Sequence, residues 1–344
     1  MHPQASVRRR APAILALGLA AGLLSTGAAP SRETLHPIGA LPPALARLAR
    51  GALAFQRVRD GSFYVFDPRD HAVYHIDAAM RAATQVVRVG AEAGHLLQPT
   101  AFASEPDGTF AVADAPTQER IQVFASDGTR IGGFFPPGRS RFQVILDGLV
   151  IGGVGSMQYN GRAVLVSEPA TGALATEYSP DGGPIRAFGR LRDTDQPDPA
   201  VRTLLNTGLP LFVPGGGYDY VFQTGTPLFR KYDRTGRLLF ERHIEGREID
   251  PLVAQLPTEW PPRPAGSTEI PVTDPIVRAA AVDPAGNLWV ALAVPYLYVY
   301  DPEGDKIRVV QLETPAGPLV ATSLFFDGRG RLLVTPGCNI FDPK

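Results

Sequence analysis

The chain has 344 residues, and its 33 lysines and arginines nearly balance 34 aspartates and glutamates, for a formal net charge of −1. This balance argues against general nucleic-acid binding, which needs a basic face to neutralise phosphates. Glycine (36) and proline (34) are abundant and Cys338 is the single cysteine, so we expect many short strands joined by turns and no internal disulfide.

The first 28 residues predict a cleaved signal peptide. Three arginines, Arg8–Arg10, precede an apolar run at Ala11–Leu24, and Thr26–Ala28 offers a cleavage site. The run is shorter than the ~20 residues of a comfortable membrane span, although a retained anchor is the alternative. Cleavage leaves 30 basic against 34 acidic residues. We therefore expect residues 29–344 to form one domain that is periplasmic or secreted, with the Sec or Tat route left open.

The clearest repeat unit runs from Pro99 to Phe135. Its four apolar runs are Thr100–Ser104, Thr109–Asp114, Arg120–Ala125 and Thr129–Phe135, and Asp-Gly pairs separate the first from the second and the third from the fourth. Such pairs supply the positive φ that tight hairpins need. The same order returns at Ile276–Leu312. Two copies of a four-stranded unit predict a repeat architecture.

Weaker copies fill the remainder and bring the count to six, so the predicted fold class is all-β, a six-bladed β-propeller of four-stranded antiparallel blades. The last copy ends without a fourth strand, and Glu33–Gly39 has no blade of its own. We expect this N-terminal strand to close the ring by pairing with the last blade. Seven blades are the alternative, with another blade in Arg139–Val154 or in residues 245–275.

Two units resemble known propeller repeats. Residues 99–125 are similar to an NHL-type repeat, and the run Val282–Ala291 resembles both that repeat and blades of the SMP-30/gluconolactonase group, a TolB-like architecture. Lactonases of that group hold a divalent metal in the central channel, so the resemblance implies calcium or zinc if the chain is an enzyme. Asp283 and Asn287 match the hairpin part of the motif, and turn formation accounts for them.

Function in a propeller is expected on the top face, where loops between blades gather with those joining second to third strands. Two long connections, Ser179–Val201 and Glu245–Pro275, stand out, and long loops in compact domains are often functional. The first carries Arg186, Arg190 and Arg192, which suit an anionic ligand or are simply solvated. The candidate ligand-binding residues are Asp67, His71, Asp114, Arg120, Arg186, Trp260, Arg278 and Tyr296.

Each candidate has a structural alternative. Asp67 and Asp114 end second strands, where a carboxylate commonly caps the following turn. Trp260 is either a binding aromatic or an anchor for its proline-rich loop. His71 and His75 stand four residues apart on or beside a strand, about 13 Å by strand geometry, too far for one ion.

Two functional hypotheses follow. In the first, the protein is a non-catalytic module that binds a protein, peptide or glycan through its top face, with no nucleic acid, no stable membrane insertion and no cofactor. In the second, it is a lactonase-like hydrolase or lyase whose channel holds a divalent ion with acids such as Asp114 and Asp283. Three or more converging carboxylates or amides at the channel mouth would favour the enzyme, and an apolar or arginine-rich mouth would favour binding.

Overall fold

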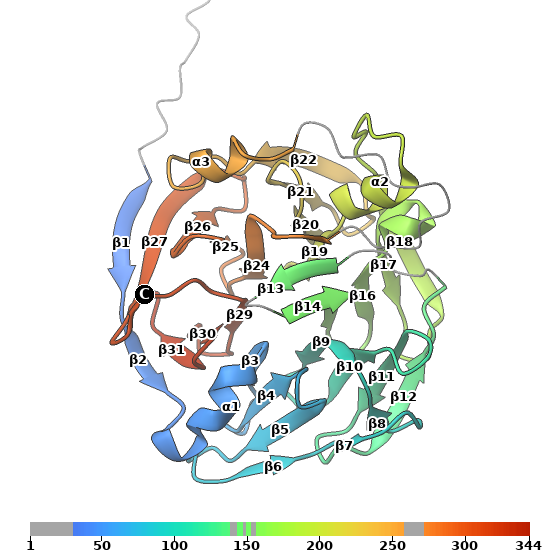
Figure 1. Ribbon diagram of the computed structural model, residues 1–344, viewed down its shortest axis with the longest axis vertical. Helices are drawn as coiled ribbons and strands as arrows, with labels where there is room; N and C mark the ends of the chain where they lie inside the picture. The colour runs from blue at the N-terminus through green and yellow to red at the C-terminus, as the bar shows by residue number, and fades with distance from the viewer. Residues whose placement is uncertain (1–29, 138–142, 147–148, 153–155, 258–271) are drawn as a thin grey trace, which may run out of the picture.

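The computed structural model describes residues 30–137, 143–146, 149–152, 156–257 and 272–344, and in it six blades stand around a central channel (Figure 1). The predicted signal peptide and Trp260 lie outside these residues. Blade 1 consists of β3 (Ala54–Arg57), β4 (Phe63–Asp67), β5 (Ala72–Ile76) and β6 (Ala83–Gln85). Blade 2 consists of β9 (Pro99–Ser104), β10 (Phe110–Asp114), β11 (Arg120–Phe124) and β12 (Arg130–Phe134). Blade 3 consists of β15 (Met157–Tyr159), β16 (Val164–Ser167), β17 (Ala173–Tyr178) and β18 (Pro184–Arg190).

The remaining blades complete the ring. Blade 4 consists of β19 (Gly208–Phe212), β20 (Tyr218–Phe222), β21 (Leu228–Tyr232) and β22 (Leu238–His243). Blade 5 consists of β24 (Val277–Val282), β25 (Leu288–Leu292), β26 (Tyr296–Tyr300) and β27 (Lys306–Thr314). Blade 6 consists of β29 (Ser323–Phe326), β30 (Leu332–Thr335), β31 (Asn339–Phe341) and β2 (Pro37–Ala40). The six-bladed all-β prediction is confirmed. Whether the repeats are of the NHL or SMP-30 type stays a prediction.

The hairpins on the bottom face use aspartates in the manner that the sequence indicated. In blade 2 the Asp107 carboxylate accepts a hydrogen bond from the backbone N–H of Thr109 at 2.9 Å, and Gly108 has a φ of +93°. The equivalent Asp283 accepts from the backbone of Ala285 at 2.9 Å and from the Trp289 indole at 3.0 Å. These carboxylates therefore shape turns, as the structural alternative for Asp283 predicted.

The N-terminal segment closes the ring. β2 pairs antiparallel with β31 and supplies the fourth strand that the last blade lacks. The preceding strand β1 (Ser31–Leu35) pairs in parallel with β27, so it adds a further strand to the edge of blade 5. The predicted closure by Glu33–Gly39 is confirmed, and the segment spans two neighbouring blades (Figure 1).

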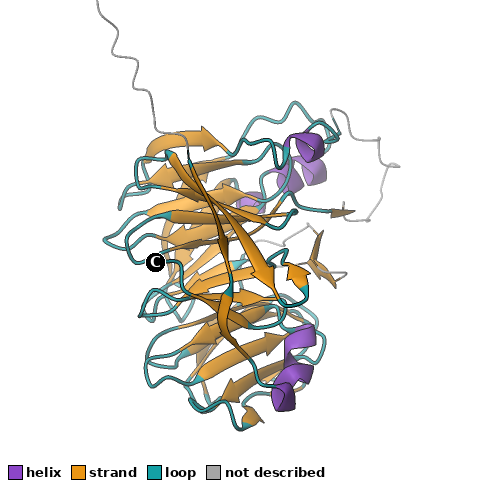
Figure 2. Ribbon diagram, turned by 90° about the vertical axis from the view of Figure 1, so that its left-hand side faces the viewer, coloured by secondary structure: helices purple, strands orange, loops and turns teal. Residues whose placement is uncertain are grey.

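The connections between blades gather on one face, which we call the top face. Its three α-helices are α1 (Ala46–Gly51), α2 (Pro199–Leu205) and α3 (Asp250–Val253), and Figure 2 shows them on the same side of the ring. Short elements in these connections are the 3₁₀ turn η1 (Pro43–Leu45), the pair β7 (Arg88–Val89) and β8 (His95–Leu96), and β28 (Gly317–Pro318) beside β27. A second 3₁₀ turn, η2 (Pro169–Thr171), lies within blade 3 between β16 and β17. No helix among the described residues is long and apolar enough to cross a membrane.

A small sheet over the channel takes the place of a seventh blade. β13 (Gln143–Leu146) and β14 (Leu149–Gly152) form a hairpin, and β23 (Val272–Thr273) pairs in parallel with β13. We call this three-stranded sheet the cap, and it lies over the centre of the ring in Figure 1. Val144 and Leu146 of the cap pack with Leu204 of α2 and Leu53. The apolar segments that suggested an extra blade therefore form the cap.

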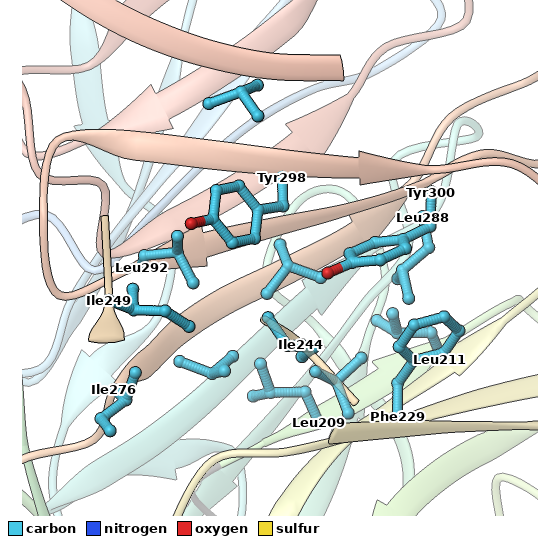
Figure 3. Packing of buried hydrophobic residues seen from close by; sticks show 14 residues of the cluster. Leu209, Leu211, Phe229, Ile244, Ile249, Ile276, Leu288, Leu292, Tyr298 and Tyr300 are labelled. Atoms are coloured by element: carbon cyan, nitrogen blue, oxygen red, sulfur yellow. The ribbon is translucent and has the colours of Figure 1, made fainter. Parts of the chain in front are cut away.

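Neighbouring blades are held together by apolar layers. Between blades 4 and 5, Leu209 and Leu211 of β19 pack with Tyr298 and Tyr300 of β26, and Ile249 before α3 joins them from the top face (Figure 3). Burying such side chains stabilises the fold by roughly 1.5–3 kcal/mol each. The ring thus has one apolar layer per interface instead of one central core.

One predicted loop is wrong. Residues 179–201 do not form a single connection between blades, because β18 lies inside them and pairs with β17 as the outer strand of blade 3. The run Pro184–Arg190 has mostly exposed side chains, so its apolar pattern is weak. An outer strand that packs on one side only gives the sequence little periodicity to show.

Candidate functional site

The central channel contains a cavity of about 730 Å³ lined by the innermost strand of every blade. Its walls are mainly alanine, leucine, proline and phenylalanine, and Leu146 of the cap lines it from the top face. Its polar lining residues are Gln56, Thr100, Ser104, Glu105, Ser156, Gln158, Gln223, Arg278, Thr322 and Ser323. A cavity of this size, with apolar walls interrupted by polar side chains, has the usual character of a small-molecule site.

Three glutamines of the channel wall connect neighbouring blades. Gln56 of β3 accepts hydrogen bonds from the backbone and the hydroxyl of Ser104 in blade 2, at 2.7 and 2.8 Å. Gln158 of β15 accepts from the backbone N–H of Phe212 in blade 4 at 2.8 Å. Gln223 donates to the carbonyl of Arg278 in blade 5 at 3.3 Å. These side-chain amides form hydrogen bonds with backbone groups of the inner strands, which have no further strand to pair with on the channel side.

Glu105 is the titratable carboxyl of the channel wall. Glu105 follows β9 at the bottom end of the cavity. Its pKa is raised to about 7, mainly by burial and also by the nearby Asp107 carboxylate, while Arg59 opposes the rise. A carboxyl with a pKa near neutrality can hold or release a proton under physiological conditions. Sequence reasoning missed this residue because Glu105 stands in an ordinary turn, and its partial burial arises only when the ring closes.

Asp114 and Arg120 form a buried ion pair that holds the connection between blades 1 and 2. Arg120 donates through Nε and Nη2 to the two carboxylate oxygens of Asp114, both at 2.8 Å. The same guanidinium donates to the backbone carbonyls of Ala91, Glu92 and His95 at 2.8 to 3.2 Å. The carboxylate is fully buried, and Leu97 N–H also donates to it at 3.1 Å. Both residues lie at the top-face end of blade 2, where they hold residues 91–97. A ligand-binding role for them stays a prediction.

Asp67 and His71 are engaged in the same way in blade 1. Asp67 is buried, accepts from the backbone of Arg69 at 2.9 Å, and has a raised pKa because of that burial. A Cβ on Gly51 would lie 1.8 Å from its Oδ2, so α1 ends in a glycine here. His71 Nδ1 accepts from the backbone N–H of Gln98 at 3.1 Å, whereas His75 contacts Ser62 at 2.9 Å.

The other candidates divide between top and bottom. Arg278 lines the channel near its top end, and Tyr296 starts β26 on the top face and packs on the layer between blades 4 and 5. Arg186 is a correction, because it lies on β18 and donates to the Tyr218 hydroxyl at 2.9 Å and to the carbonyl of Arg234 in a bottom turn. Trp260 lies outside the described residues.

The predicted basic cluster does not converge on one site. Arg192 stacks over the Phe222 ring at 4.0 Å and donates to the carbonyl of Thr226 at 2.9 Å. Burial lowers its pKa to about 10. Arg190 accepts a bond at its backbone carbonyl from Arg230 on the adjacent blade. The three arginines of this segment therefore connect blades 3 and 4.

The residues of the channel do not fit a divalent metal. Asp114 lies in the top loop of blade 2 and Asp283 in a bottom turn of blade 5, so the two acids expected to share an ion lie at opposite faces, outside the cavity lining. Within the described ranges no group of three His, Cys, Asp or Glu side chains could hold an ion. The amide oxygens of Gln56 and Gln158 already accept backbone hydrogen bonds. A metal needs several converging oxygen or nitrogen donors.

Comparison with known proteins supports the fold alone. No protein-family model and no curated protein matches the chain. A structure of virginiamycin B lyase from Staphylococcus aureus is similar at a TM-score of 0.51 and 10% identity, over 84% of this chain and 78% of the lyase. A catalytically inactive variant of the same lyase, with quinupristin, gives a TM-score of 0.52 at 9% identity, over 83% of this chain and 78% of the lyase. Hydrazine synthase of Kuenenia stuttgartiensis gives 0.50 at 12% identity, over 83% of this chain and 73% of that one. Such identities establish shared architecture and carry no activity across.

Asp219 is a buried carboxyl outside the channel. It lies on β20 between Leu211 and Lys231, on the side that faces blade 5, and neither of its oxygens has a hydrogen-bond partner among the described residues. Burial raises its pKa to about 6 from 3.8, and Lys231 opposes the shift. Because the folded state binds this proton more tightly than the unfolded chain, stability is lost as pH rises from about 4 through about 6.

The Asp219→Asn variant should therefore be more stable than the parent at pH 7.5, by about 3 kcal/mol or roughly 5 °C in melting temperature, and equal to it near pH 4. Asp233→Asn in the adjacent bottom turn is the matched control. Hydrogen bonds from Thr235 and Arg237 lower the Asp233 pKa, so this change should not stabilise the protein at pH 7.5. Melting curves at both pH values test this prediction. An equal increase in melting temperature for Asp219→Asn at pH 4 would show that the stabilisation does not come from removing a buried charge at Asp219.

Proposed function

We propose that this protein is an exported binding module that holds a small, largely apolar ligand in its central channel beneath the cap. Export is motivated by the basic, apolar and small-residue order of residues 1–28. Sequencing the N-terminus of protein recovered outside the cytoplasm tests it, because cleavage after Ala28 starts the mature chain at Ala29.

The cavity carries the binding proposal. Its 730 Å³ lies within the range of small-molecule sites. Gln56 and Gln158 are already bonded to neighbouring blades, and the larger part of the lining surface is apolar. The cap adds Leu146 to this surface from a segment that belongs to no blade. A channel of this kind favours binding over the metal-dependent hydrolase, for which the described part of the channel wall offers no converging set of donors.

Filling the channel tests the proposal. Ala280 of β24 is partly exposed and lines the cavity. We expect the neutral fluorescent probe N-phenyl-1-naphthylamine to bind the parent protein and the Ala280→Phe variant at least tenfold more weakly, because the added ring occupies the site. Ala316→Phe, in an exposed turn of blade 5, is the matched control and should bind like the parent.

Melting curves show whether each variant is folded, and Ala280→Leu replaces Ala280→Phe if the larger ring prevents folding. Equal probe fluorescence for the blocked and control variants would place the probe elsewhere. A parent protein that does not bind the probe would remove the channel as an apolar ligand site.

A further inference from the structure

A second cavity adjoins the channel at its bottom mouth. It has a volume of about 670 Å³, and we call it the vestibule. The vestibule and the channel cavity are both lined by Pro106, Pro214, Val282, Phe325 and Phe326. A ligand that fills the channel therefore meets the vestibule at its lower end.

The vestibule wall is basic. Arg57, Arg59 and Arg329 line it, and Asp327 is the acidic residue among its lining residues. Asp327 is already engaged, because it accepts from the Arg57 guanidinium at 3.3 Å and from the backbone of Arg329 at 2.9 Å. The lining thus carries three cations against one anion.

Two of these arginines are available to a ligand. The side chains of Arg59 and Arg329 are exposed, whereas Arg57 also donates to the Gly61 carbonyl and lies 5.3 Å from the centre of the Phe63 ring. Arg59 interacts over a longer range with Glu105 and Asp107, and its backbone N–H bonds Pro106 at 2.8 Å. The planar guanidinium fork suits a carboxylate, sulfate or phosphate oxygen pair.

Prolines stiffen three turns of the vestibule rim other than the two that carry Arg59 and Arg329. Pro106, Pro214 and Pro284 stand in the first bottom turns of blades 2, 4 and 5, and all three line the vestibule. Proline fixes its own φ, so these turns lose little conformational freedom when a ligand binds.

We propose that the vestibule and the channel together bind an amphipathic anion, with its charged headgroup at Arg59 and Arg329 and its apolar chain in the channel. This inference rests on the proposed function and adds the class of ligand. The apolar wall above the arginines and the shortage of acidic lining residues favour an anion with an apolar tail over a cation or a sugar.

The test compares three probes with the same ten-carbon chain: decanoate, decan-1-ol and decyltrimethylammonium, measured by calorimetry at pH 7.5. We expect decanoate to bind at least tenfold more tightly than either of the others. In an octanoate, nonanoate and decanoate series, each added methylene should tighten binding about fourfold, because burying one CH₂ contributes about 0.8 kcal/mol.

Charge variants locate the headgroup. The double variant Arg59→Gln/Arg329→Gln should lose at least tenfold in decanoate affinity and leave decan-1-ol binding unchanged. Arg130→Gln/Arg162→Gln is the matched control, because both residues are exposed and outside the vestibule lining while the net charge changes equally.

The outcomes separate this inference from the proposal on which it rests. Equal binding of decanoate and decan-1-ol, unaffected by the arginine variants, would overturn the anionic headgroup and keep the channel site. Failure of all three probes would overturn both. Arginine-dependent pelleting with phosphatidylglycerol vesicles, without decanoate binding in solution, would assign the arginines to a membrane surface and also overturn the inference.

Discussion

Replacing Arg120 by alanine should lower the melting temperature by roughly 5–8 °C. Arg120 donates two hydrogen bonds of 2.8 Å to the Asp114 carboxylate, which is fully buried. Removing one partner of a buried ion pair leaves an uncompensated charge and costs about 3–5 kcal/mol. The variant also loses the donors that hold the carbonyls of the loop at residues 91–95.

Two further variants sharpen this prediction. Arg120→Lys should have an intermediate effect, because an ammonium cannot form the bidentate pair and reach the same carbonyls. Arg162→Ala, an exposed arginine of the next blade, should change the melting temperature by less than about 2 °C. A loss for Arg120→Ala no greater than that of the control would show that the pair does not hold the loop.

Deleting residues 33–39 should also lower the melting temperature by roughly 10 °C or more. The deletion removes most of β2 and the end of β1, so β31 keeps β30 as a pairing partner but loses β2, the strand that links blade 6 to the start of blade 1. The N-terminal segment also no longer spans blades 5 and 6. Leu35, which packs on the layer between those blades, is lost as well. An opened ring exposes strand edges, so aggregation on heating should increase.

Two further experiments separate the contribution of strand pairing by the N-terminal segment from that of its ion pair with Arg308. A synthetic peptide of residues 31–40 added to the deleted protein should restore part of the lost stability, because an extended peptide can pair with an open edge. Glu33→Gln breaks the partly exposed ion pair with Arg308 and should cost less than about 1 kcal/mol. An unchanged melting temperature after the deletion would mean that the ring does not depend on this closure.

Local patterns predicted most of the blades. The Asp-Gly turns at Asp107 and Asp127 fix hairpins through contacts within a few residues, so blade 2 is found at the expected positions. Blade 3 is the exception, because its outer strand β18 is largely exposed and its pattern resembles that of a loop. Single positions on the top face could not be assigned as ligand sites from the sequence, because the contacts that engage them are tertiary or depend on the loop conformation. Asp67 accepts from the backbone of Arg69, and Arg120 donates to Asp114 and to the connection from blade 1.

The sequence by itself determined the blade count, the turn chemistry and the closing strand, because each depends on residues close in the chain or on one strand left without a partner. Tertiary structure alone decided where the cavity and its charges lie. Arg59 and Arg329 are 270 residues apart and meet at one mouth, and the partial burial that raises the pKa of Glu105 exists only in the closed ring. The cap was equally hidden, since β13 and β23 pair across more than a hundred residues.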